Sequence, residues 1–581
     1  MKVGIDRVEV RSDVDARVRV TGPGPFAVGS VEVDIGVLDD VGWAWEVANR
    51  GDEPISLEAV AVVWRVHNAV EPVRMLRHGY QSWSPTGVAT FGVDSDPSRS
   101  GAHWLAIGMH HADPEAAWPG ELRSELVTAI QDANGDLVVA GFLGGYEHDG
   151  TFRLRPAADG TGAIELWAEA YLGGAVFEPG ESRQLHAVMM RTGEDNPSLS
   201  LARWAAAAGA AGGARVDAPY QVGWCSWYRY FAGVSEDDVR QNLAEASDWP
   251  FSVFQVDDGY QRAIGDWLVT NERFPAPLHR LAAAIEAQGL TPGIWLAPFV
   301  ASPTSDVATQ HPDFIAAHGR RRPLVGMVNE AWGGPVHVLD TTRPEVLAHL
   351  EEVARTLVES GYTYLKLDFT YAPGLPGRFA DRSRTPAQRV RAGFDAIRKG
   401  AGDSTFLLGC GAPLGASIGV VDGMRIGPDV APWWQVQASQ WRPAGYEGGE
   451  PSTLNAWRNT LVRAFQHRLL WLNDPDCLML RSEHTELPPG AARAWALAVG
   501  VSGGMALVSD DLAALDRQAR ALFDEVLELG RAADAAAQGE GNPPRCPDLL
   551  VSPTPTRLQS GQVELVGDPG SATAIVQGRL A

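Results

Sequence analysis

Between residues 221 and 530, short apolar runs alternate with segments of helical periodicity, and this alternation constrains the fold more than any other feature. An apolar run of strand length followed by a helix is typical of a βα unit, whose strands pair in parallel. Eight such units in roughly 300 residues predict a (β/α)8 barrel. The expected strands cover 221–227, 251–257, 291–299, 362–369, 405–410, 421–426, 477–480 and 504–509. The clearest expected helices cover 236–246, 278–288, 344–359, 386–399, 454–471 and 510–529.

The first 200 residues show a different pattern, in which short alternating runs are separated by Gly, Pro and Asp. Val31-Glu32-Val33-Asp34-Ile35 has an apolar residue at every second position, and the run from Ala61 to Val66 is more continuously apolar. Period-two alternation between turn residues is typical of antiparallel strands in a β-sandwich. We therefore predict a β-sandwich over 1–200, the barrel over 215–530 and, after a Pro-rich segment, a small β-unit over 540–581.

The charge balance limits the partners of the chain. It carries 48 basic and 72 acidic side chains, a formal net charge of −24. Nucleic acids and anionic membranes are polyanions whose binding requires clustered Lys and Arg, so we expect neither as a partner. The N-terminus lacks the apolar core of a signal peptide, and no apolar run approaches the ~18 residues that a membrane span needs. Four widely spaced cysteines fit a reduced compartment, so we expect a cytoplasmic protein, of unknown oligomeric state.

Three of the expected barrel strands end in carboxylates. Asp257 and Asp258 close the second strand, Asp368 closes the fourth and Asp429 follows the sixth. In a barrel of this kind, the catalytic groups lie where the strands end and the βα loops begin. A single Asp after a strand is more often the N-cap of the next helix. That interpretation is weaker here because several carboxylates are expected at the same end of the barrel.

Lysine is rare in this chain, which contains only Lys2, Lys366 and Lys399. Lys366 precedes Asp368 by two residues, so that both side chains lie on the same face of a strand. An ammonium group beside a carboxylate stabilises its ionised form. A structural ion pair is the alternative for Lys366. Because Arg is used almost everywhere else, however, we infer that this position needs the compact ammonium.

Tryptophan is abundant, with 20 residues, most of which we expect in cores and interfaces. Carboxylates and indoles in one pocket suit a sugar, whose hydroxyls form hydrogen bonds while its C–H face packs on a ring. Metal chemistry fits less well, because no two His residues have ligand spacing near these strand ends. Neither a Walker pattern nor a G-x-G-x-x-G follows a strand there. We therefore expect a small saccharide as the ligand, with no metal and no cofactor.

The motif series resembles glycoside hydrolase family 36, the bacterial α-galactosidases and their plant raffinose-synthase relatives. The order and spacing agree over about residues 75 to 510. The resemblance implies an N-terminal β-supersandwich, a catalytic (β/α)8 barrel and a small C-terminal β-domain, in line with the division above. The motifs are Gly223-Trp224-Cys225-Ser226-Trp227-Tyr228, Val256-Asp257-Asp258-Gly259-Tyr260, Gly293-Ile294-Trp295-Leu296-Ala297-Pro298, Leu365-Lys366-Leu367-Asp368 and Asp422-Gly423-Met424-Arg425-Ile426-Gly427-Pro428-Asp429.

The resemblance also implies a retaining double displacement and a role for each matching residue. Asp368 matches the nucleophile of the family, and Asp429 matches its general acid/base. Retention needs these two carboxyl groups ~5–5.5 Å apart. The other matching residues are implied to bind the sugar: Asp257, Asp258 and Lys366 at its 4- and 6-hydroxyls, Arg425 and Cys410 as further contacts, Trp295 as a ring platform, and Trp83 as an N-terminal residue that reaches over the site.

Two departures from the family pattern leave the sugar open. Gly334-Pro335 stands where many members carry an Arg, and Ala412 stands where relatives often have Ser or Gly. The leading hypothesis is an exo-acting α-galactosidase for small α-galactosides. The alternatives are a retaining glycosidase or transglycosylase for another α-sugar, and a catalytically silent carbohydrate-binding protein. The presence of both expected carboxylates disfavours the silent protein.

Overall fold

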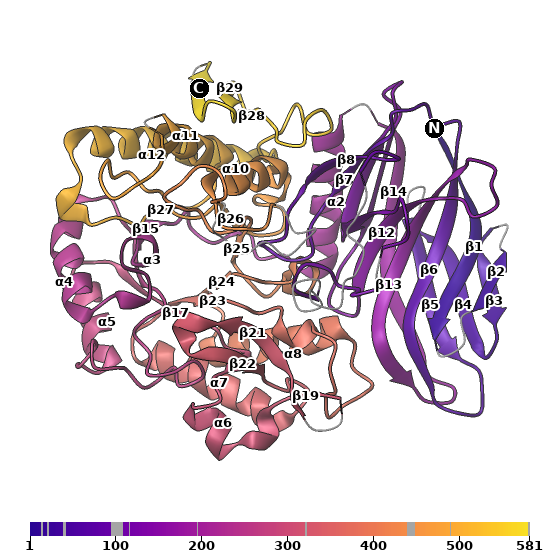
Figure 1. Ribbon diagram of the computed structural model, residues 1–581, viewed down its shortest axis with the longest axis horizontal. Coiled ribbons are helices and arrows are strands. Elements are labelled where there is room, and N and C mark those ends of the chain that lie inside the picture. Colours follow the sequence, from indigo (N-terminus) through magenta and orange to yellow (C-terminus); the bar gives the residue numbers. More distant parts are fainter. Residues whose placement is uncertain are drawn as a thin grey trace.

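The structure is a computed structural model of the 581-residue chain. It describes residues 1–12, 16–19, 22–38, 42–94, 108–115, 117–194, 196–319, 322–437, 448–488 and 490–578. A parallel barrel, an N-terminal pair of antiparallel sheets and a small C-terminal sheet make up the molecule (Figure 1). This architecture confirms the predicted fold class. Among the described residues, no helix is long and apolar enough to cross a membrane.

The barrel is a nearly closed ring of parallel strands. In the described part of the chain it has eight strands, in the order β26-β25-β24-β23-β17-β16-β15-β27. Across the remaining gap, the backbone N–H of Met505 donates to the carbonyl of Asn473 at 2.9 Å. The strands are β15 (Val222–Cys225), β16 (Val253–Val256), β17 (Thr291–Leu296), β23 (Tyr364–Leu367), β24 (Phe406–Gly409), β25 (Gly423–Arg425), β26 (Leu472–Asp474) and β27 (Ala506–Val508).

Seven of these strands lie inside the predicted runs, but the prediction of the seventh strand was wrong. The barrel uses β26 (Leu472–Asp474) instead of 477–480. Pro475 follows β26 directly, and Asp476 has a φ of +95°, so the chain turns away from the strand direction. The run after Cys477 is apolar because it is buried against the barrel, where Leu478 forms a single parallel bridge with Val508.

The helices around the barrel begin where their sequences provide caps. Ser235 and Asp238 form a capping box at α4 (Glu236–Glu245), as Thr385 and Gln388 do at α8 (Pro386–Ala401). Helix α11 (Ala491–Ser502) was not predicted, because it is buried nearly all round and shows no amphipathic period. The other helices of four or more residues here are α3 (Trp227–Tyr230), α5 (Leu278–Glu286), α6 (Asp306–Gln310), α7 (Pro344–Glu359), α9 (Leu414–Ser417), α10 (Thr453–Val462) and α12 (Arg517–Glu540).

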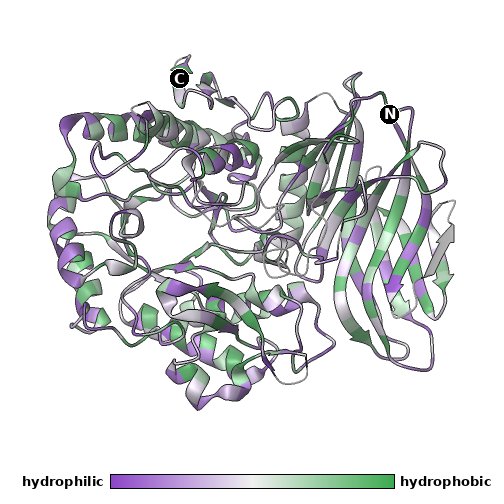
Figure 2. Cartoon of the chain, in the orientation of Figure 1, coloured by the Kyte–Doolittle hydropathy of each residue, from purple (hydrophilic) through white to green (hydrophobic). Residues whose placement is uncertain are grey.

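The N-terminal region packs two antiparallel sheets face to face. Within the described ranges, one sheet has six strands in the order β2-β1-β6-β13-β12-β9, and the other has eight in the order β3-β4-β5-β14-β11-β10-β7-β8. Figure 2 shows the hydrophobic and hydrophilic bands that alternate along these strands. In β4, Val33 and Ile35 are buried, whereas Asp34 between them is exposed.

The strands of this region have the following bounds: β1 (Lys2–Ser12), β2 (Ala16–Arg19), β3 (Gly24–Val28), β4 (Val31–Leu38), β5 (Gly42–Asn49), β6 (Ile55–His67), β7 (Arg74–Arg77), β8 (Gly87–Thr90), β9 (Leu122–Glu125), β10 (Val127–Gln131), β11 (Leu137–Phe142), β12 (Asp149–Pro156), β13 (Ile164–Phe177) and β14 (Ser182–Glu194). The Ala-rich stretch that follows folds as α2 (Pro197–Gly212). Its Trp204 is fully buried and donates its indole N–H to the carbonyl of Phe142 at 3.0 Å. Helix α2 therefore connects the sandwich to the barrel.

Two further sheets complete the fold. An antiparallel sheet of β18 (Val300–Ala301), β21 (Val325–Asn329) and β22 (Gly334–Val338) is inserted between β17 and β23. The C-terminal sheet of β28 (Arg557–Ser560), β29 (Val563–Asp568) and β30 (Thr573–Gln577) packs near α11 (Figure 1). Trp434 and Trp457 donate their indole N–H groups to the carbonyls of Pro569 and Pro555, which holds the C-terminal segment against the barrel.

Candidate active site

A pocket of about 200 Å³ lies where strands β16, β17 and β23 end. It brings together seven of the nine residues that the sequence predicted for the site. These are Trp83, Asp257, Asp258, Trp295, Lys366, Asp368 and Asp429. The other two, Cys410 and Arg425, are buried and do not line the pocket.

Lys366 forms an ion pair with Asp257 in the pocket. Its Nζ lies 2.9 Å from Oδ2 of Asp257, which also accepts a hydrogen bond from Gln255 at 2.6 Å. Burial favours loss of the Lys366 proton, but the negative charge of Asp257 outweighs it and raises the pKa of Lys366 well above its usual value. The lysine is therefore a permanent cation. Its carboxylate partner follows β16, which is separated from β23 by β17, and is not Asp368, as the same-face argument implied.

Asp258 is held by two side-chain donors. Its Oδ1 accepts from the amide of Gln261 at 2.6 Å, and its Oδ2 accepts from the indole N–H of Trp332 at 2.8 Å. Only 3% of Asp258 is exposed, and burial raises its pKa to about 6 despite these hydrogen bonds. Two adjacent carboxylates therefore differ: Asp257 faces an ammonium, whereas Asp258 faces only neutral donors.

Asp368 lies directly after β23, and two N–H groups fix its carboxylate. Oδ2 accepts from the indole of Trp295 at 2.9 Å, and Oδ1 accepts from the backbone of Phe369 at 2.9 Å. Burial raises the pKa of Asp368, while Lys366 opposes the rise. Phe369 has a φ of +53°, a left-handed conformation that costs energy for a side chain of this size. Such strain is typical of residues beside a catalytic group.

Trp295 is 2% exposed. The edge of its ring contacts Asp368, because the indole N–H donates a hydrogen bond to that carboxylate. The platform role that the resemblance implies stays a prediction. The geometry adds a second role, in which Trp295 orients the carboxylate.

Asp429 differs from the other three carboxylates because 34% of its side chain is exposed. Its Oδ1 accepts from Nη2 of Arg425 at 2.7 Å. Arg425 is 1% exposed and lies behind Asp429, so in this structure it acts on the pocket through that carboxylate. Cys410 is fully buried, and its thiol has a pKa raised well above the usual value by burial. A direct sugar contact by Arg425 or Cys410 stays a prediction.

The N-terminal region supplies one wall of the pocket. Trp83 lies 4.8 Å from the ring of Phe369, centroid to centroid, in an edge-to-face contact. Its segment is fastened to the barrel by buried Arg463, which donates to the carbonyl of Ser82 at 2.7 Å and to that of Gly79 at 3.0 Å. A Cβ at Gly411, whose φ is +51°, would lie within 3 Å of the Trp83 ring. Gly411 therefore makes room for this side chain.

The pocket also has residues that the sequence analysis did not assign to it. They are Met109, His110, Trp227, Asn329, Trp332, Phe369, Gly449 and Pro451. Trp332 and Asn329 come from the inserted β21–β22 hairpin, whose position over the barrel no local pattern reveals. The usable signal was the position of Trp227, which lies two residues after β15, and of Trp332, which lies just before β22.

The two departures lie near the site without lining the pocket. Ala412 is fully buried, and its carbonyl accepts from the backbone N–H of Ser82 at 3.2 Å. Gly334 has a φ of +116° at the start of β22, and a Cβ there would meet open space. In the described parts of the chain, no group of three or more His, Cys, Asp or Glu side chains could hold a metal ion.

Comparison with known proteins gives consistent sequence matches. A Melibiase family model matches residues 222–375, the segment from β15 to just beyond β23. The α-galactosidase AgaA of Geobacillus stearothermophilus is 27% identical over 180 residues, which cover 29% of this chain and 24% of that relative. The match thus spans about a quarter of the relative's length.

Solved structures match over much more of the chain. TtGalA, an α-galactosidase from Thermus thermophilus solved with p-nitrophenyl α-D-galactopyranoside, is 27% identical, with 94% of this chain and 99% of that chain covered and a TM-score of 0.69. The glycoside hydrolase family 36 α-galactosidase AgaA shares the fold at 14% identity, with coverage of 97% and 77% and a TM-score of 0.60. These matches confirm the resemblance to glycoside hydrolase family 36 that the motifs indicated.

Proposed function

We propose that this chain is an exo-acting α-galactosidase that hydrolyses terminal α-galactosyl residues of small saccharides by a retaining double displacement. One observation carries the proposal: Asp368, fixed by two N–H donors, and the partly exposed Asp429 line one pocket with the pair formed by Lys366 and Asp257. The similarity to TtGalA, which has been solved with an aryl α-galactoside and with stachyose, supports the choice of sugar.

In the first step, Asp368 attacks the anomeric carbon, and the bond to the leaving group breaks. Asp429 gives its proton to the departing glycosidic oxygen, so the leaving group departs as an alcohol. The indole of Trp295 and the backbone N–H of Phe369 hold the two oxygens of Asp368 in one orientation for this attack. The product of the step is a glycosyl ester of Asp368.

In the second step, Asp429, now ionised, takes a proton from water as that water attacks the anomeric carbon. The ester bond breaks, Asp368 leaves as a carboxylate, and the sugar departs with its original configuration. Asp429 is suited to both steps because it is the most exposed of the four pocket carboxylates and can exchange a proton with water.

The deep end of the pocket recognises the sugar. Lys366 is a donor, Asp257 is an acceptor, and Asp258, with a pKa of about 6, is an acceptor that can carry a proton in mildly acidic solution. Such a set can bind both an axial and an equatorial hydroxyl. We assign it the 4- and 6-hydroxyls, of which the axial 4-hydroxyl separates galactose from glucose.

A panel of p-nitrophenyl glycosides tests the proposal. We expect hydrolysis of the α-galactoside with a strong preference over the α-glucoside and the β-galactoside, and α-galactose as the first product in a time-resolved proton NMR spectrum. β-Galactose as the first product would disprove retention. A preference for the α-glucoside would disprove the sugar assignment and favour the alternative of a glycosidase for another α-sugar.

A further inference from the structure

Asp476 lies behind the pocket, at a position where the sequence analysis expected no function. It is 3% exposed and follows β26. Its Oδ2 accepts from the hydroxyl of Tyr228, from Nη2 of Arg425 and, at 2.8 Å, from the backbone N–H of Val430. Its Oδ1 accepts from the backbone N–H of Cys477 at 2.7 Å. Asp476 therefore touches the residue after Asp429 as well as the arginine that touches Asp429.

Arg425 is shared between two carboxylates. Its Nη2 donates to Oδ1 of Asp429 at 2.7 Å and also to Asp476, with the hydroxyl of Tyr228 at 3.1 Å as a third acceptor. Only one of the two carboxylates is partly exposed: the side chain of Asp429 is 34% exposed, against 3% for Asp476. The buried partner thus holds the guanidinium in place, while the exposed partner faces the substrate.

The backbone of Asp476 supports a specialised role. Its φ of +95° is left-handed, and its own N–H donates to Oδ1 of Asp474 at 2.9 Å, which holds this turn. A φ this large lies beyond the left-handed helical region that Asp tolerates, and such strain concentrates at functional sites. Without the turn, the Asp476 carboxylate would not reach Arg425 and Val430 at the same time.

We propose that Asp476 is a positioning residue for Asp429. Asp476 fixes Arg425 and the backbone at Val430, directly after Asp429. Because Asp476 also shares the charge of Arg425, Asp429 can carry the proton that the leaving group needs. This inference rests on the proposed function, because it assigns Asp476 to the acid step of that reaction. Asp476 itself does not touch the sugar.

A guanidinium whose positive charge faced Asp429 alone would attract that carboxylate more strongly. A second carboxylate on the same nitrogen offsets that attraction and repels a negative charge on Asp429. Burial raises the pKa of Asp476, whereas the donors on both of its oxygens, Arg425 among them, favour the ionised form that this offset requires. The charged and titratable groups that act on Asp476 and Asp429 include Arg425 from β25, Asp474 from β26, Tyr228 from α3, Cys410 after β24, Cys477 and Asp368.

The test compares Asp476→Asn with the wild-type protein over a range of pH. We expect the basic limb of the kcat/KM profile to move to lower pH by about one unit, because Asp429 loses its proton more easily. Stachyose, whose leaving group needs the proton, should lose about tenfold or more in kcat/KM. The p-nitrophenyl galactoside, whose leaving group departs unaided, should lose less than about threefold.

Asp510→Asn is the matched control. Asp510 is also fully buried and pairs with an arginine, Arg481, at 2.7 Å, but it does not contact Asp429. We expect this variant to keep the wild-type basic limb and the wild-type ratio between the two substrates. Asp476→Glu, which retains a carboxylate, should recover part of the lost stachyose activity.

An unshifted limb with equal losses on both substrates would overturn the inference and leave Asp476 a structural residue. If the Asn variant does not fold, Asp476→Thr keeps an oxygen for the Val430 N–H without the charge and gives the same comparison. A ¹³C NMR titration of the Asp429 carboxyl, assigned with Asp429→Asn, reads the pKa without turnover. An inactive wild type would refute the proposed function, and the titration would still decide the inference.

Discussion

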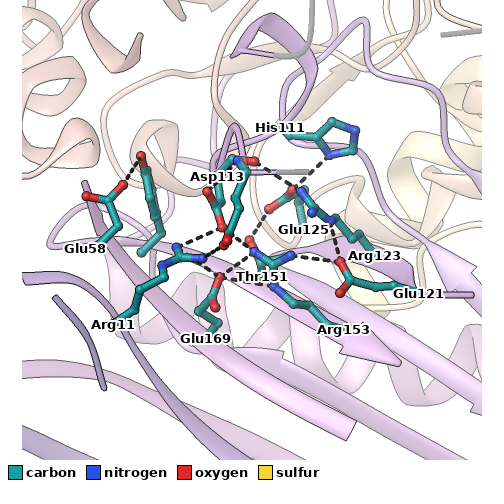
Figure 3. Close-up of polar contacts among 12 residues, drawn as sticks. Arg11, Glu58, His111, Asp113, Glu121, Arg123, Glu125, Thr151, Arg153 and Glu169 are labelled. Carbon is teal, nitrogen blue, oxygen red and sulfur yellow. Dashed lines mark hydrogen bonds and ion pairs between the residues drawn. The ribbon is translucent and has the colours of Figure 1, made fainter. Parts of the chain in front are cut away.

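The barrel and the sandwich each bury a cluster of charges, and the two clusters are built on opposite principles. The pocket cluster combines two cations with four carboxylates: Lys366, Arg425, Asp257, Asp258, Asp368 and Asp429. The sandwich cluster centres on the fully buried Arg153, which donates to Asp113, Glu121 and Glu169, with Arg11 and Arg123 beside it (Figure 3). In the pocket cluster the carboxylates outnumber the cations, and Asp258 and Asp368 accept from neutral N–H donors. In the sandwich cluster, Asp113, Glu121 and Glu169 each pair with at least one arginine.

The pKa values follow this difference. In the sandwich cluster, burial alone would raise the pKa of Asp113 and Glu121, but the arginines outweigh burial and lower both. In the pocket cluster, burial raises the pKa of Asp258 to about 6 and also raises that of Asp368. Matched buried charges hold a fold together, whereas a surplus of carboxylates leaves groups that can bind, attack and exchange protons.

The largest expected effect is the loss of activity in Asp368→Ala. Removing the nucleophile should lower kcat by roughly 10³-fold or more on an aryl α-galactoside, measured by release of the phenol. The melting temperature should stay the same or rise, because the wild-type carboxylate is buried with a raised pKa. Asp113→Ala should show the reverse pattern, with lower stability and normal turnover. Wild-type activity in Asp368→Ala would refute the nucleophile assignment.

The second largest effect should be on stability, in Arg153→Met. Arg153 is fully buried and donates to Glu121 at 2.9 Å, to Glu169 at 2.7 Å and to Asp113. Removing it leaves buried carboxylates unpaired, so the free energy of unfolding should fall by about 3–5 kcal/mol. Calorimetry measures the loss, and activity per folded molecule should remain within about twofold of the wild type.

Arg50→Met is the control for that variant. Arg50 pairs with Glu32 at 2.8 Å on the surface of the same region, with 52% of its side chain exposed. Its loss should change the free energy of unfolding by less than about 1 kcal/mol. Equal losses in the two variants would show that the sandwich cluster does not depend on burial.

Lys366→Arg should have the third largest effect, although it preserves the charge. The ammonium is buried 2.9 Å from Asp257, and a planar guanidinium cannot occupy the same compact position. We expect kcat/KM to fall by about 10²-fold. Lys399→Arg is the matched control, because 72% of the Lys399 side chain is exposed, and its kinetics should be unchanged. Near-normal kinetics in Lys366→Arg would contradict the inference, drawn from the rarity of lysine, that this position needs the compact ammonium.

The smallest expected effect separates the two clusters by pH. A carboxyl whose folded pKa is raised to about 6 makes the native state bind more protons, so it reduces stability as pH rises from about 4 to 6. Asp258→Asn removes this effect and should be more stable than the wild type by about 1 kcal/mol at pH 7, with no gain at pH 4. Denaturant unfolding at both pH values measures it. A lower stability of Asp258→Asn at pH 7 would contradict the surplus-charge interpretation.

Asp113→Asn should respond with the opposite sign. The folded pKa of Asp113 is lowered, so its contribution to stability is present at neutral pH and is lost as pH falls through that lowered value. The variant should therefore be less stable than the wild type at pH 7, and the difference should shrink in acid.

The sequence predicted most of the barrel because its strands and helices carry local signals. The caps at Ser235 and Thr385 indicate where α4 and α8 begin, and the apolar run 362–369 indicates strand β23. The prediction failed where burial alone made the chain apolar, as in α11 and in the run after Cys477. The limits 1–200, 215–530 and 540–581 stay predictions.

The site was predictable to the extent that its residues end strands. Asp257, Asp258, Asp368 and Lys366 lie in the pocket because neighbouring parallel strands end together. Which carboxylate Lys366 pairs with depends on the lateral arrangement of strands, which the spacing within one strand cannot give. Trp332, Asp476 and Arg463 come from an inserted hairpin, a turn and a helix end, and only the folded chain brings them to the site.

The fastening of residues 79–84 by Arg463 has a consequence for how the protein acquires its activity. The segment lies between β7 and β8 of the sandwich, yet its carbonyls accept from a barrel residue nearly 400 positions later. The pocket therefore has no complete wall until both parts have folded and met. Catalytic competence therefore requires that the sandwich and the barrel dock against each other.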